Sequence, residues 1–196
     1  STLGMMTLLR GVILVYTKGS PIPIKSDAYK FFGKGSIAGI PVPVIILIIV
    51  FLLAHYILTQ TSYGRSVYAV GGNREAARLS GIRVKTSEFL VYTLNGLMCG
   101  MAGLILTARL GSAQSTSGTG IEMDAIAAVI LGGTSLSGGV GFVLPTVVGA
   151  MIMGIIDNIL TLMNVNPHAT NIVKGAVILI AVLVDKKVKD LSAKAE

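Results

Sequence analysis

The chain has 196 residues, of which 53% are hydrophobic and 13% are charged, and its mean hydropathy is +0.79. A soluble domain usually carries about 25% charged residues, so this composition indicates an integral membrane protein. The net charge of +7 would suggest nucleic-acid binding in a soluble protein, but here the positive residues lie mainly between apolar runs. In that position they favour a fixed topology and contact with anionic membrane lipid, and no nucleic-acid partner is expected.

The first apolar segment, residues 3–16, follows a start at Ser1, with no basic segment before it and no cleavage site after it. A secretory signal would show both features. We therefore expect a cut inside a larger protein, with residues 1–196 forming the C-terminal part of a single transmembrane domain. Residues 17–40 are polar and rich in Gly, Pro and Lys, which predicts a loop.

Four longer apolar runs follow, at residues 42–58, 89–108, 142–163 and 172–184. A membrane-spanning helix needs about 20 residues, with about 17 as a lower bound. The first three runs meet this length, and the fourth meets it only if it begins near His168. Backbone groups in a bilayer must be satisfied within the segment, and the runs do not alternate as barrel strands do. The sequence thus predicts an all-α, polytopic transmembrane helix bundle.

A shorter apolar segment, Asp124 to Leu131, is only about half a span and ends in a series of glycines between 132 and 141. This pattern predicts a broken or re-entrant helix, with Asp124 as its N-cap. Such helices line cavities in transporters. A phosphate-binding loop is the less favoured alternative, because the segment has no lysine.

The loops differ in positive charge, which predicts their side of the membrane. The connector 60–87 carries five Lys and Arg residues and the tail 185–196 carries four, whereas the loops 111–123 and 164–168 carry none. We expect the connector and the tail on the cytoplasmic side. Residues 17–40 do not fit this scheme, because they should be external and yet hold four lysines.

The connector contains a pattern typical of a short capped helix at residues 73–81. Asn73 is a good N-cap, Glu75 suits the first turn, and Gly81 can take the left-handed position at the end. Arg74 and Arg78 are four residues apart and share a face. This helix could fit a groove on a soluble partner or could be an ordinary surface helix. The candidate partner-binding residues are Asn73, Arg74, Glu75, Ala76, Ala77, Arg78, Leu79 and Gly81.

Polar residues inside membrane spans are costly, and they therefore mark candidate pathway residues. The candidates for a neutral solute are Thr93, Asn95, Thr107, Asp157 and Asn158. We also expect Asp157 to face Lys174, because the short turn 164–168 makes the last two spans antiparallel neighbours. The alternative is that each of these two charges reaches the interface or pairs elsewhere.

Several kinds of chemistry are not expected. Cys99 is the only cysteine, so an internal disulfide and a cysteine metal site are excluded. His55 and His168 are isolated from other ligands, so no metal or other cofactor is expected. No catalytic set can be assembled, and no Gly-x-x-x-x-Gly-Lys-Ser/Thr loop is present to bind ATP.

Several blocks of the sequence resemble one transport family. The connector GRSVYAVGGNREAARLSGIRVKTSEF is similar to the coupling-helix region of ABC importer permeases of the ribose and branched-chain amino acid class. The segments TLGMMTLLRGVILVYTKGSPI, IAAVILGGTSLSGGVG, VVGAMIMGIIDNILTLMNVNP and VKGAVILIAVLVD resemble the sugar permeases of this class in the same order. Together they cover most of the chain, which lacks the further N-terminal spans of the family.

The resemblance implies a multi-pass permease subunit in the bacterial inner membrane, not an enzyme, that imports a monosaccharide of the ribose type. Its implied partners are ABC ATPase subunits, a second permease subunit and a periplasmic sugar-binding protein. The segment 60–87 would couple the permease to the ATPases, and its motion would pass through the spans at 42–58 and 89–110. Two alternatives stay open: a permease of the same fold for branched-chain amino acids, nucleosides or a signalling sugar, and a secondary transporter or channel without an ATPase.

Overall fold

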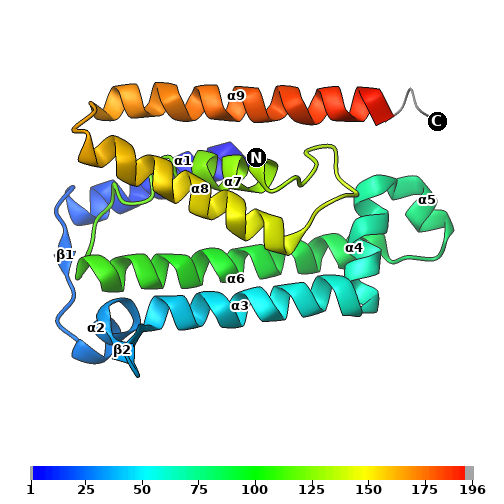
Figure 1. Ribbon diagram of the computed structural model, residues 1–196. Coiled ribbons are helices and arrows are strands. Elements are labelled where there is room, and N and C mark those ends of the chain that lie inside the picture. The colour runs from blue at the N-terminus through cyan, green and yellow to red at the C-terminus, as the bar shows by residue number, and fades with distance from the viewer. Residues whose placement is uncertain (1, 193–196) are drawn as a thin grey trace. The chain divides into compact units, whose positions relative to one another are not determined.

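The chain is described by a computed structural model that covers the backbone of residues 2–192 and the side chains of 4–166, 169–179, 182 and 183. Most of this backbone is helical (Figure 1). In chain order, the elements are α1 (Thr2–Thr17), β1 (Ile22–Pro23), α2 (Asp27–Lys34), β2 (Ser36–Ile37), β3 (Ile40–Pro41), α3 (Val42–Gln60), α4 (Ser62–Gly72), α5 (Arg74–Leu79), α6 (Val84–Leu110), β4 (Ser112–Ala113), α7 (Ile121–Leu131), α8 (Val143–Leu162) and α9 (Pro167–Ser192).

Among the described residues, three helices are long and apolar enough to cross a membrane, and they confirm the first three predicted spans. These helices are α3, α6 and α8. The most apolar windows of α3 and α6 have only 6% and 0% of their residues buried inside the protein. Side chains this exposed and this apolar are suited to lipid or to further protein segments rather than to water.

The fourth predicted span lies in α9, which begins at Pro167, next to His168, where the sequence requires it to begin. Proline suits the first helical position because its missing N–H would have no partner there. The apolar part of α9 among the described side chains is Ala169–Leu179, which is shorter than a full span. The helix continues to Ser192 into the predicted charged tail. The four tail lysines, Lys186, Lys187, Lys189 and Lys194, lie outside the described side chains.

The chain folds as two compact units. The first combines the residues up to Val50 with Phe89–Thr119, and the second combines Phe51–Glu88 with the chain from Gly120 onwards. Helices α3 and α6 each contribute residues to both units.

In the first unit, the prediction of a loop at 17–40 is wrong in part, because this segment contains α2 and three short strands. Asp27 in the first turn of α2 and Lys34 in its last turn both suit the helix dipole. The helix docks on α6 closely: the Tyr29 hydroxyl lies 2.8 Å from the Thr107 hydroxyl, and a Cβ on Gly33 would collide with the backbone of Arg109. Tertiary packing on α6 thus orders a stretch whose composition is typical of a loop.

In the second unit, α7 has 11 residues and ends at Gly132, which confirms the predicted half-length helix. The expectation of Asp124 as N-cap is wrong, since α7 begins earlier and its cap is Gly120, with φ of +89°. Helix α7 packs tightly on α8, where a Cβ on Gly149 would collide with the carbonyl oxygen of Ala128. The small core between α7, α8 and α9 contains Ala127, Ala128, Met153, Ile156, Val177 and Ile178.

Candidate functional site

Helix α5 forms at the place where the connector sequence predicts a capped helix. The Asn73 side chain accepts a hydrogen bond from the Ala76 N–H at 3.0 Å, and its own backbone N–H donates to the Ala69 carbonyl at the end of α4. One residue therefore ends α4 and begins α5. Gly81 has φ of +83°, the left-handed conformation expected after the helix.

Ion pairs hold α5 in place. The Arg74 guanidinium makes two contacts with the Glu88 carboxylate at the start of α6, Nε to Oε1 at 2.9 Å and Nη2 to Oε2 at 3.0 Å. Arg78 pairs with Glu75 at 3.3 Å on the helix itself. Paired N–H groups from one guanidinium fix orientation better than a single contact does. The two arginines, which were predicted to share a face of the helix, are both exposed. Each pairs with a different carboxylate.

The exposed side of α5 can contact a partner. Ala77 is buried with 4% of its surface exposed, whereas Leu79 is 83% exposed. Glu75 and Arg78 are exposed with it. The predicted partner-binding residues therefore fall into two groups. Ala77 packs inside the protein, whereas Glu75, Arg78 and Leu79 are exposed to solvent or a partner.

Helix α4 was not distinguished in the sequence from the rest of the hydrophilic connector. Thr61 caps it by accepting from the Gly64 N–H at 3.2 Å. The hydroxyl of Tyr68, on α4, donates to the Gly141 carbonyl at 2.9 Å. This hydrogen bond joins α4 to the glycine-rich segment after α7. The phenol of Tyr63 is buried without a hydrogen-bond partner among the described residues, and burial raises its pKa above the ordinary value.

Four glycines make the contact between α4 and the segment 132–141, and we call them the glycine contact: Gly71, Gly72, Gly138 and Gly139. A Cβ on Gly71 would lie 2.8 Å from the Gly139 nitrogen, and one on Gly138 would lie 2.5 Å from the Gly71 carbonyl oxygen. At Gly71, Gly138 and Gly139 the two backbones therefore meet at a distance that leaves no room for a Cβ, whereas a Cβ on Gly72 would be in ordinary contact at 3.8 Å from the Gly139 Cα. The pair of adjacent glycines in each segment was the feature of the sequence that could have indicated this contact.

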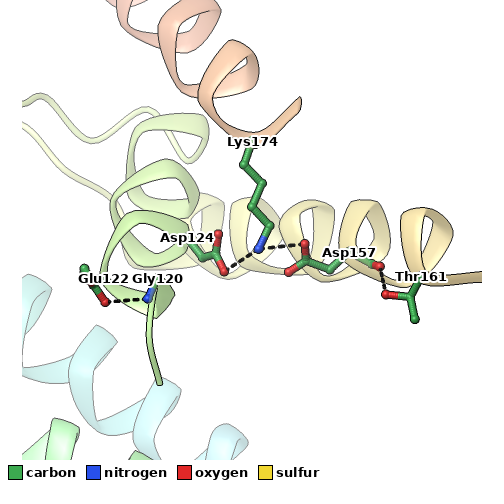
Figure 2. Close-up of polar contacts among 6 residues, drawn as sticks. All are labelled: Gly120, Glu122, Asp124, Asp157, Thr161 and Lys174. Carbon is green, nitrogen blue, oxygen red and sulfur yellow. Dashed lines mark hydrogen bonds and ion pairs between the residues drawn. The ribbon is translucent and has the colours of Figure 1, made fainter. Parts of the chain in front are cut away.

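A charged network joins α7, α8 and α9 (Figure 2). The Lys174 ammonium lies 2.9 Å from Asp157 Oδ1, which confirms the expected pair. It also lies 2.8 Å from Asp124 Oδ2, which the sequence did not indicate. Only 18% of the lysine side chain is exposed, and 23% of that of Asp124. Two carboxylates for one ammonium leave a formal charge of −1 in a site that is largely shielded from solvent.

The other predicted pathway residues are divided between the two compact units. Thr93, Asn95 and Thr107 lie on α6 in the first unit, where Thr93 hydrogen-bonds the Phe89 carbonyl of its own helix. Asn158 is exposed on α8 in the second unit, beside the half-buried Asp157. Of this set, the structure connects Thr107 to Tyr29 and Asp157 to the charged network. Within the described residues, no group of three or more His, Cys, Asp or Glu side chains could hold a metal ion.

Together the long apolar helices and the sparse interior of the described residues indicate a polytopic membrane protein. The chain belongs to the family described as "Branched-chain amino acid transport system / permease component", which matches residues 1–182. This membership makes it a transport component rather than an enzyme.

Several curated proteins are similar over most of the chain. The ribose import permease protein of Escherichia coli (strain K12) is 53% identical over 191 residues, which cover 95% of this chain and 60% of that protein. The ribose import permease protein of Bacillus subtilis (strain 168) is 49% identical, with 95% and 59% covered. The xylose transport system permease protein of Escherichia coli (strain K12) is 48% identical, with 77% and 38% covered.

The chain thus spans about 60% of the length of the ribose permeases it matches. No solved structure matches it.

Proposed function

We propose that this protein is the permease subunit of an ATP-driven importer for a monosaccharide of the ribose type in a bacterial inner membrane. The similarity to ribose import permeases over 95% of the chain supports the substrate class. The partners are a pair of ABC ATPase subunits, a second permease subunit and a periplasmic sugar-binding protein. The chain itself contributes the membrane pathway and binds no ATP.

The observation that carries the proposal is helix α5. It is capped at Asn73, fixed to α6 by Arg74 and Glu88, and placed between the two membrane helices α3 and α6. A short capped helix with an exposed leucine next to two exposed charged residues, Glu75 and Arg78, can seat in a groove of a soluble subunit. We assign α5 the role of coupling helix for the ATPase.

The glycine contact offers a route for the motion. Helix α4 is continuous with α5 through Asn73, and it meets the segment 132–141 backbone to backbone. A displacement of α5 would therefore move the segment 132–141, which follows α7, in addition to any movement through α3 and α6. In this proposal, the motion of that segment and of α7 opens or closes the pathway by alternating access.

Co-purification of the full-length permease with its ATPase tests the proposal. Deletion of residues 74–80 should abolish the association and ATP-dependent ribose uptake, because it removes the exposed face of α5. Glu75→Arg should weaken both, because it reverses one charge on that face. Glu122→Arg makes the same charge change in the first turn of α7 and should leave the association intact. Full association and uptake in the deletion variant would refute the coupling role.

A secondary transporter that needs no ATPase is the second candidate. The charged network of Lys174, Asp124 and Asp157 favours it, because ionisable groups in membrane segments often serve proton or ion coupling. Uptake that persists unchanged without any ATPase subunit, and that responds to a proton or sodium gradient, would establish this alternative.

A further inference from the structure

Positive side chains of the first unit gather at the end where α1 ends, α3 begins and α6 ends (Figure 1). Three contacts bring these segments together. Strand β1 pairs with β4, the Ile24 N–H donates to the Gly111 carbonyl at 3.0 Å, and Gly33 of α2 lies against the backbone of Arg109. We call this region the basic end, and its positive residues are Lys18, Lys25, Lys30, Lys34 and Arg109.

The charge of the basic end is poorly balanced within the protein. Asp27 is the only acidic residue in the sequence of the first unit, and its carboxylate lies 3.2 Å from the Lys30 ammonium. Five positive residues and one negative residue give the basic end a formal charge of +4. Positive charge concentrated on one surface attracts an anionic partner.

Helix α2 (Asp27–Lys34) has the character of a helix that lies flat at a membrane surface. It is strongly amphipathic and has little hydrophobicity on average. One side docks on α6, and Lys30 and Lys34, four residues apart, share a second side. Phe31 and Phe32 remain 46% and 45% exposed. Lysines on one side and exposed aromatic rings on another are typical of helices that lie in the plane of the membrane interface.

The contacts of α2 place it at the boundary of the bilayer. The membrane helix α3 begins at Val42, whose backbone N–H donates at 2.9 Å to the carbonyl of Gly35, the residue directly after α2. The membrane helix α6 ends at Leu110, next to the point where α2 docks. Both apolar helices thus meet α2 at their ends, which is the level of the lipid headgroups.

The composition of this surface favours lipid over a soluble protein as its partner. Lysine is depleted at protein–protein interfaces, whereas four of the five positive residues here are lysines. Ile37 and Ile40, which follow α2, are also 52% and 47% exposed. A bilayer accommodates both kinds of group, because acyl chains take up the apolar side chains while the long lysine stems carry their ammonium groups to the phosphates.

We infer that the basic end binds the headgroups of anionic phospholipids, with α2 lying in the plane of the membrane interface. Lys30 and Lys34 contact lipid phosphates, and Phe31 and Phe32 contact acyl chains. In the predicted orientation these lipids belong to the external leaflet. The four lysines of residues 17–40, which do not fit the charge expected of an external loop, thereby acquire a role. The inference holds for any solute that the permease carries.

Fluorescence quenching tests the inference in the full-length permease, reconstituted into vesicles of equal parts phosphatidylglycerol and phosphatidylcholine. Phe32→Cys carries an environment-sensitive fluorophore, in a background with the other cysteines replaced, Cys99→Ser included. One of the two lipids is brominated on its acyl chains in each preparation. Brominated phosphatidylglycerol should quench about threefold more strongly than brominated phosphatidylcholine, because each lysine near the surface favours anionic lipid. Ile37→Cys is a second reporter position if Phe32→Cys does not fold.

Charge substitutions of opposite sign make the test specific to the basic end. Lys30→Gln together with Lys34→Gln should remove the preference for the anionic lipid. Asp27→Asn should increase it, because Lys30 loses its carboxylate partner. Arg83→Gln together with Lys85→Gln removes the same charge from the connector and should leave the preference at the reporter unchanged.

Salt provides a measurement that needs no charge substitution. At about 1 M salt the Debye length falls to about 3 Å, so the preference of the reporter protein for the anionic lipid should weaken. Equal quenching by the two lipids, or a preference that survives the substitution of both lysines, overturns the inference. Weak quenching by both lipids, with a change in fluorescence when the sugar-binding protein is added, also overturns it and assigns this surface to a soluble partner.

Discussion

The Lys174 ammonium forms ion pairs with two carboxylates at nearly the same distance, 2.8 Å to Asp124 and 2.9 Å to Asp157. A lone ammonium within an apolar helix pair would be costly, because little water remains to solvate it. Two acidic partners from two different helices offset that cost. The lysine therefore ties α9 to both α7 and α8, and its removal would leave two carboxylates facing each other.

This arrangement predicts an order of stability among variants. Lys174→Met should destabilise the protein more than Asp157→Asn, because the latter leaves a neutral Lys174–Asp124 pair. A double-mutant cycle on Asp157 and Lys174 should give a coupling energy of about 1–3 kcal/mol. Thermal unfolding in detergent measures each step. A coupling energy near zero would show that the pair does not contribute to stability.

The tyrosines of α4 give a matched pair of substitutions. Tyr68→Phe should destabilise the protein by about 1 kcal/mol, because it removes a hydrogen bond to the Gly141 carbonyl. Tyr63→Phe should be neutral or stabilising, because it removes a buried hydroxyl without a partner among the described residues. Melting temperatures of the two variants in the same detergent provide the comparison, and the reverse order would contradict both hydrogen-bond assignments.

At the scale of single residues, the sequence predicted the contacts that depend on local geometry. Asn73, Gly81 and the Asp157–Lys174 pair follow from capping rules and from a short turn between two helices. Asp124 could not be assigned to Lys174, because the contact joins residues 50 apart and depends on how α7 packs on α8 and α9. Tyr68 was missed for the same reason, since its acceptor is a backbone carbonyl 73 residues away.

At the scale of elements, the glycine contact joins two segments that must move together if α5 drives α7. Its strength comes from shape rather than from any polar group, because both sides lack a Cβ. A side chain on either segment would push α4 away from the segment 132–141 and would weaken the connection between them.

Two alanine variants separate crowding from backbone strain. Gly133→Ala should cost about 1–2 kcal/mol, because the residue has φ of +73° but no atom within 4 Å of the added Cβ. Gly138→Ala carries similar strain at φ of +88° and also places a Cβ 2.5 Å from the Gly71 carbonyl oxygen, so it should cost more.

The same variants test the proposed route of motion. Gly138→Ala should reduce ribose uptake per ATP hydrolysed, whereas Gly133→Ala should lower stability without changing this ratio. Reconstituted complexes measure both quantities, and equal ratios in the two variants would refute transmission through the glycine contact.

The length of an apolar run was enough to predict a helix when the run was long or when glycines ended it sharply. Spans α3, α6 and α8 and the short α7 were predicted on that basis. Helix α2 was not, because its eight residues include two lysines and a glycine and its order comes from docking on α6. The start of α7 was misplaced because Gly120, not a polar side chain, caps it.

At the scale of the whole molecule, charge sets the predicted orientation and apolar length sets the number of crossings. Cysteine labelling in intact cells tests this topology, in a background with Cys99→Ser. Asn164→Cys should react with a membrane-impermeant reagent, and Arg83→Cys should react only after the membrane is opened. Labelling of both positions from outside would contradict the predicted orientation.

The glycine contact has a consequence for how such a sequence can change over time. When two large side chains touch, growth of one can be accommodated by shrinkage of the other, so the pair can drift together. Gly71 and Gly139 cannot become smaller to make room for a larger partner, because each is already the smallest residue. Neighbouring positions in the core can explore many compensated combinations, but Gly71, Gly138 and Gly139 must each be retained independently.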